Sequence, residues 1–63
     1  MSVLSAAFAE YLRQKKIDPD AFRAADPERY AEWERLFGQF SPESFTSQKK
    51  FLMNSTRRLY LLR

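Results

Sequence analysis

Four polar side chains near the C-terminal end of the chain have the types and the spacing to grip an anion. They occupy positions i, i+4, i+7 and i+8 of one segment and are Lys50, Asn54, Arg57 and Arg58. On a helix these four positions fall within an arc of about 100°. Lysine and arginine in such a row contact phosphates, which gives affinity for nucleic acid with little sequence information. We call these four residues the basic row, and its predicted partner is nucleic acid or a ribonucleoprotein.

The positive charge of the chain is concentrated in its C-terminal part. Residues 1–38 contain six Lys and Arg against seven Asp and Glu, whereas residues 39–63 contain five against one. The local net charges are therefore −1 and +4, which together give the +3 of the whole chain. Such asymmetry favours an anionic partner. A plainer interpretation is also open, because cations are favoured in the last turns of any helix and a solvated helix face carries charge.

The same segment permits a second hypothesis, in which it binds another protein or a second copy of the chain. Leu61 projects near the middle of the basic arc if the helix continues that far, and Met53 flanks the predicted core side of the segment. A mixed surface of Arg, Leu and Met resembles the centre of a protein interface. An acidic set earlier in the chain would complement the basic row in a weak homodimer. This set is Glu28, Glu32 and Glu34. A monomer and a weak homodimer therefore both remain open.

Catalysis, metal binding and cofactor binding are not predicted. The chain has no histidine and no cysteine, so no serine has an ordinary general base beside it and zinc sites built from these residues are excluded. The Asp18-Pro19-Asp20 segment lacks the glycine and the further ligands of a calcium loop. We therefore expect a non-catalytic binding module with no metal and no cofactor.

The N-terminal segment gives no targeting signal. It lacks a basic n-region and reaches Glu10 after a short apolar run, and no stretch of the chain approaches transmembrane length. The absence of cysteine fits a reducing compartment. We expect a cytoplasmic protein that makes no membrane contact.

Helices must position the basic row, and one capping device, used three times, marks where they start. In each copy a side-chain oxygen caps free backbone N–H groups, proline takes the first helical position, and an acid meets the positive end of the helix dipole. The copies are Asp18-Pro19-Asp20, Asp26-Pro27-Glu28 and Ser41-Pro42-Glu43. The predicted helices span residues of about 3–16, 19–25, 27–39 and 42–60.

Apolar spacing predicts which faces of these helices are buried. Trp33 should lie at the centre, among Phe8, Phe37 and residues of the last helix. The predicted buried stripes are Leu4, Phe8, Tyr11 and Leu12; Phe22; Tyr30, Trp33, Phe37 and Phe40; and Phe45, Leu52, Thr56 and Leu59, with Phe51 at the margin of the last. The predicted fold is all-α. It is one small domain, 1–63, in which three main helices and one short helix form a compact antiparallel array.

Overall fold

The structure is a computed structural model that describes residues 3–62. Within this range the chain forms α1 (Val3–Gln14), α2 (Pro19–Ala25), α3 (Pro27–Gln39), α4 (Pro42–Gln48) and α5 (Lys50–Leu59). Residues 3–62 contain no strand, only an isolated antiparallel bridge between Ile17 and Leu61. The predicted all-α fold is confirmed. Met1, Ser2 and Arg63, which the predicted domain includes, lie outside the described residues.

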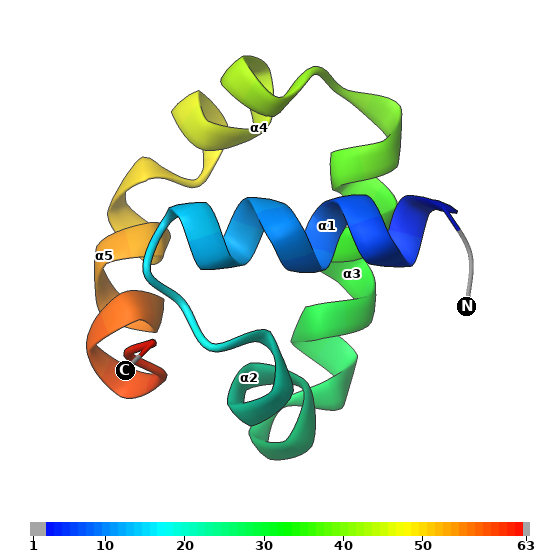
Figure 1. Ribbon diagram of the computed structural model, residues 1–63. Helices are drawn as coiled ribbons and strands as arrows, with labels where there is room; N and C mark the ends of the chain where they lie inside the picture. Colours follow the sequence, from blue (N-terminus) through cyan, green and yellow to red (C-terminus); the bar gives the residue numbers. More distant parts are fainter. Residues whose placement is uncertain (1–2, 63) are drawn as a thin grey trace.

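The helices wrap around a shared centre and do not form the predicted antiparallel array. Figure 1 shows α1 crossing α3 at a steep angle, with α2 and α4 on opposite sides of α1. One cause is the brevity of the connections. Asp26 alone joins α2 to α3, as the C-cap of one helix and the N-cap of the next. An antiparallel helical hairpin needs a loop of roughly two to five residues, so a one-residue junction turns the chain without reversing it.

The three predicted helix starts are confirmed at Pro19, Pro27 and Pro42. At the first of them, the Asp18 Oδ1 atom accepts a hydrogen bond from the backbone N–H of Asp20 at 3.0 Å. The other two caps are Asp26, which accepts from Arg29 N–H at 3.3 Å, and Ser41, which accepts from Ser44 N–H at 3.2 Å. These starts depend on neighbours in the sequence, which is why the sequence predicts them.

The first helix ends at Gln14, two residues earlier than predicted, in a Schellman turn. The Ile17 N–H donates to the Leu12 carbonyl oxygen at 2.9 Å, and the Lys16 N–H donates to the Arg13 carbonyl oxygen at 3.0 Å. Ile17 and Leu12 are both fully buried, which supplies the apolar contact typical of this motif. Lys16 has φ 66°, in the left-handed region that favours glycine.

The core forms around Trp33, which is 2% exposed, and its burial confirms the prediction. The rings nearest to it are Phe22 at 5.3 Å and Phe45 at 5.7 Å, measured between ring centroids. The predicted neighbours Phe8 and Phe37 instead pair with each other at 5.4 Å. The buried apolar residues are Phe8, Tyr11, Leu12, Ile17, Phe22, Tyr30, Trp33, Phe45 and Met53.

A hydrogen-bonded chain ties α4 to α1. The Thr46 hydroxyl donates to the Pro42 carbonyl oxygen at 2.7 Å and also pairs with the Tyr11 hydroxyl. Because the Thr46 hydroxyl has one proton and directs it at Pro42, Tyr11 must donate in the second bond. Burial raises the pKa of Tyr11, so this donor stays protonated over the ordinary pH range.

The predicted helix over 42–60 is wrong, because the chain breaks at Lys49 into α4 and α5. Lys49 has φ −104° and ψ 15°, and its side chain makes no cap for α5. A straight helix of that span would be about 28 Å long, whereas the largest extent of the Cα atoms is 26 Å. The break therefore lets the last third of the chain follow the core.

The break also changes which residues of this segment are buried. The structure buries Met53 and Thr56 on α5. Leu52 and Leu59, predicted to be core residues, are 47% and 67% exposed. One predicted core residue of α3 is exposed as well, because Phe40 is the C-cap residue and lies beyond the last buried turn.

Candidate partner-binding face

The four residues of the basic row differ in their exposure to solvent. Lys50, Asn54 and Arg58 lie exposed on α5, whereas Arg57 is half-buried. The Arg57 Nε–H donates to the Lys15 carbonyl oxygen at 2.7 Å, and an Nη1–H donates to Asn54 Oδ1 at 3.5 Å. The last carbonyls of a helix have no partner within it. Arg57 therefore caps the end of α1, and three residues of the predicted site remain exposed.

Two more hydrogen bonds fasten the end of α5 to the turn after α1. The Asp18 N–H donates to the Tyr60 carbonyl oxygen at 2.7 Å, and the Leu62 N–H donates to the Lys16 carbonyl oxygen at 3.0 Å. The segment 60–62 consequently pairs with the turn instead of continuing the helix. These bonds fix the orientation of α5 relative to α1.

The same contacts bring the backbone of Lys15 and Lys16 beside the end of α5, while the Lys15 Nζ lies 5.6 Å from the centroid of the Tyr11 ring on α1. Sequence reasoning missed them, because Lys15 and Arg57 are 42 residues apart and only the folded chain joins them. These two lysines therefore lie, by their backbone, on the turn that Arg57 and Leu62 contact.

Large apolar side chains lie exposed on α5 next to these cations. Phe51 is 84% exposed, and Leu59 and Leu52 are the two leucines exposed by the break at Lys49. We call these three residues the apolar stripe. Leu61, which follows the end of the helix, is 54% exposed. Met53, predicted to belong to an interface, is instead buried at 3% exposure and cannot contact a partner.

The apolar stripe and the exposed cations lie side by side on one helix. At 100° per residue, Phe51, Ser55 and Leu59 fall within an arc of about 80°, with Leu52 at its margin. The three exposed residues of the basic row fall within an adjoining arc of about 80°. Together these two arcs make up what we call the outer face of α5. Its opposite side carries Met53, which packs into the core.

The cations of the outer face have no acidic partner among residues 3–62. The three ion pairs in this range lie on other helices and join Arg13 to Glu10, Arg23 to Asp20 and Arg29 to Asp26. The nearby Lys49 places its Nζ 5.8 Å from the centroid of the Trp33 ring. The positive charge of α5 is thus uncompensated within the described part of the chain.

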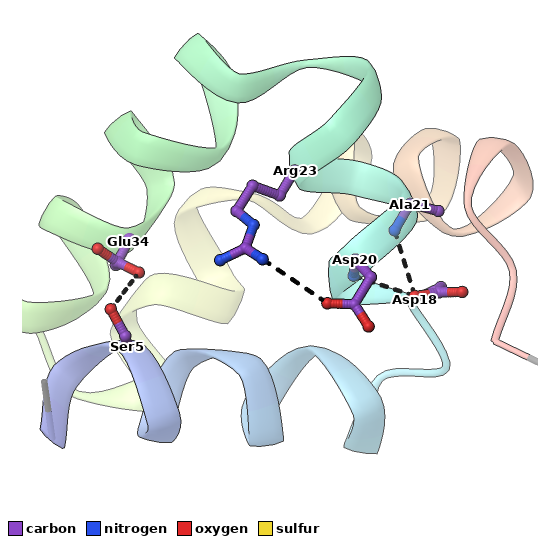
Figure 2. A network of polar contacts seen from close by, with 6 residues as sticks. All are labelled: Ser5, Asp18, Asp20, Ala21, Arg23 and Glu34. Atoms are coloured by element: carbon purple, nitrogen blue, oxygen red, sulfur yellow. Dashed lines mark hydrogen bonds and ion pairs between the residues drawn. The ribbon is translucent and has the colours of Figure 1, made fainter. Parts of the chain in front are cut away.

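A groove of about 460 Å³ lies between α1 and α2 and has a different character. Figure 2 shows its polar surroundings, with Arg23 directed at Asp20 (4.0 Å) and Ser5 donating to Glu34 at 3.1 Å. Burial, and next the charge of Glu34, raise the pKa of Tyr30 in the groove. The lining residues are Ser5, Ala6, Ala9, Arg13, Pro19, Asp20, Arg23 and Tyr30. Because Arg13 and Arg23 of the groove already pair with carboxylates, this groove is a weaker candidate for a binding site than the exposed side of α5.

No helix within residues 3–62 has the length and apolar character needed to cross a membrane. The Asp and Glu residues of the same range form no group of three that could hold a metal ion. Comparison of the chain with protein-family models, with curated proteins and with solved structures found no match.

Proposed function

We propose that this chain is a non-catalytic module that binds another protein through the outer face of α5. The observation that carries the proposal is the exposure of Phe51, Leu52 and Leu59 on one helix. A chain of 63 residues is near the size at which one core barely suffices. Side chains of this kind stabilise by roughly 1.5–3 kcal/mol each when they are fully buried. Leaving three of them in water is therefore a cost that a partner would remove.

The composition of the face favours a protein over a nucleic acid. Arg57 already binds the Lys15 carbonyl, so the basic row has fewer free cations than predicted. Leucine side chains gain nothing from phosphates, whereas aromatic, apolar and arginine side chains together are typical of protein interface centres.

Nucleic acid remains a second candidate because of one observation. Phe51 is the most exposed ring on α5, and it adjoins the exposed cations of the basic row. Single-stranded nucleic acid is bound by this combination, in which an aromatic ring stacks on a base while cations follow the backbone.

The experiment uses the immobilised chain to capture partners from a cell extract, with and without nuclease. Leu52→Ser/Leu59→Ser should abolish capture of a protein, and Lys50→Gln/Arg58→Gln should weaken it. Val3→Ser, which changes a still more exposed apolar residue on α1, and Arg35→Gln on α3 are the controls outside α5.

The nucleic-acid alternative predicts the opposite pattern. Capture would then be lost after nuclease and in the glutamine variant, while the serine variant would still bind. Its affinity would also fall with salt, by about 0.7 log units per phosphate contact on a single strand for each log unit of salt.

A further inference from the structure

We infer that the partner presents an acidic amphipathic helix to the outer face of α5, and that it is not a second copy of this chain. The inference rests on the proposed function, and it adds the charge and shape of what binds. Three features of the structure carry it: the one-sided charge of the face, the charge of its surroundings, and the mismatch with the chain's own acidic surface.

The cations lie along one edge of the apolar stripe only. Arg58 neighbours Phe51 on the helix, with Asn54 and Lys50 further round in the same direction. On the other edge, Leu52 is followed by Thr56, which is 1% exposed and belongs to the buried side. A partner that covers the stripe therefore meets positive charge on one side and the body of the protein on the other.

The positive edge is the side that faces α1. Arg57 lies beyond Lys50 in the same direction and binds the Lys15 carbonyl. The backbone of Lys15 and Lys16 also lies at this side, and no carboxylate within residues 3–62 forms an ion pair with Lys50, Arg57 or Arg58. Carboxylates of a partner would supply the missing negative charge, provided that they lie along one edge of its own apolar surface.

An antiparallel contact between two α5 helices brings like charges together. If two copies paired antiparallel with Ser55 at the centre, Lys50 of one would lie near Arg58 of the other. The helix contains no Asp or Glu to offset this repulsion, and facing like charges oppose association.

The acidic surface of α3, which the sequence left open as a partner for the basic row in a second copy, does not fit the outer face either. Exposed Arg29 and Arg35 interrupt Glu28 and Glu32 on α3, so the surface alternates in sign. Glu34 is half-buried and accepts a hydrogen bond from Ser5. The apolar side chains nearest to them form no exposed stripe, because Leu36 is half-buried and Phe40, at the C-cap, is 42% exposed. A second copy therefore offers no single surface that joins negative charge to an exposed apolar stripe, which is what the outer face requires.

The size of α5 sets the size of the partner helix. Ten residues extend over about 15 Å, or about three turns. A helix of similar length, with large apolar residues along one side and Asp or Glu along one edge, covers the stripe by ordinary helix-on-helix packing.

The test uses two synthetic helical peptides with the same apolar side, one with glutamates and one with lysines along the edge. Backbone amide shifts of the isotope-labelled chain report binding. The glutamate peptide should shift residues 50–61 saturably and bind at least about tenfold more tightly than the lysine peptide, as expected from two or three exposed ion pairs. Lys50→Glu/Arg58→Glu should reverse this preference. Arg23→Glu/Arg35→Glu, which makes the same net charge change elsewhere, should preserve it.

The outcomes separate this inference from the proposed function. Equal binding of both peptides to α5 would overturn the acidic partner and leave the docking face standing. Absence of any shift on α5 with either peptide would overturn both. Concentration-dependent dimerisation in sedimentation, with shifts on α5 and no peptide present, would overturn the inference in favour of a second copy.

Discussion

The third and fifth helices of this chain have opposite outer surfaces. On α3, exposed Glu28, Glu32 and Arg35 face solvent, and a side-chain cap from Asp26 begins the helix. On α5, an apolar stripe and unpaired cations face solvent, and no side chain caps the start. Inside the protein α3 contributes Trp33, whereas the buried residues of α5 are smaller, Met53 and Thr56. The large apolar side chains of α3 are therefore buried or half-buried within the chain, whereas α5 leaves three of its own exposed.

The contrast shows how the chain uses its few large apolar residues. Rings from α1 to α4 gather around Trp33, and their removal from water supplies most of the stabilisation available to so small a core. Phe51 is of the same residue type as the buried Phe45, yet it lies 84% exposed. Residue type alone does not assign a side chain to stability or to binding. The register of its helix does.

Replacing Trp33 of α3 should cause the largest loss in the free energy of unfolding. Trp33→Ala should cost about 3–5 kcal/mol and leave the chain largely unfolded at room temperature, because it empties the centre of the core. Phe51→Ala is the control and should leave the unfolding midpoint nearly unchanged. Circular dichroism during urea titration measures both. A Trp33→Ala protein that melts with the wild type would place this ring outside the core.

Replacing each of the two adjacent arginines of α5 should give the next largest difference in stability, because Arg57 makes a structural contact and Arg58 is exposed. Arg57→Ala should lower the free energy of unfolding by about 1.5 kcal/mol, because it removes a charged donor from the Lys15 carbonyl. Arg58→Ala should change it by less than about 0.5 kcal/mol, since Arg58 is exposed. Chemical denaturation of the two variants beside the wild type gives the difference. Equal losses of stability would show that Arg57 has no special role in fastening α5 to α1.

The turn that holds α5 against α1 contains a strained residue. Lys16→Gly should stabilise the protein by about 0.5–1 kcal/mol, because the relief of left-handed strain exceeds the entropy that glycine adds to the unfolded chain. Lys16→Ala retains the strain and should bring no such gain, which separates backbone relief from loss of charge. Thermal unfolding of both variants gives the answer. A stabilised alanine variant and an unchanged glycine variant would contradict the left-handed conformation.

Local chemistry explains which parts of the fold the sequence predicts well. The proline caps at Asp18, Asp26 and Ser41 depend only on residues within one turn, and all three lie where the pattern placed them. The break at Lys49 has no such signal, since neither proline nor glycine lies there. It depends on the packing of the whole chain around the core, and it moves the buried register from Leu52 to Met53.

The candidate face on α5 was predictable in part for the same reason. Lys50, Asn54 and Arg58 are exposed on one arc, as helical spacing indicates. The role of Arg57 depends on Lys15, a distant part of the chain, so spacing alone could not assign it. The prediction of one continuous helix placed Leu52 and Leu59 in the core, so the sequence did not reveal the apolar stripe.

The most direct test of the account combines stability and binding in Phe51→Ser/Leu59→Ser. We expect the free energy of unfolding to stay within about 0.5 kcal/mol of the wild-type value, because neither side chain belongs to the core. Affinity for the glutamate peptide should fall by more than about tenfold, which corresponds to roughly 1.4 kcal/mol of lost binding. Both quantities are measured on the same preparation, by urea titration and by amide-shift titration. A variant that binds like the wild type, or one that loses its fold together with its binding, would contradict the claim that the outer face of α5 exists to dock a partner.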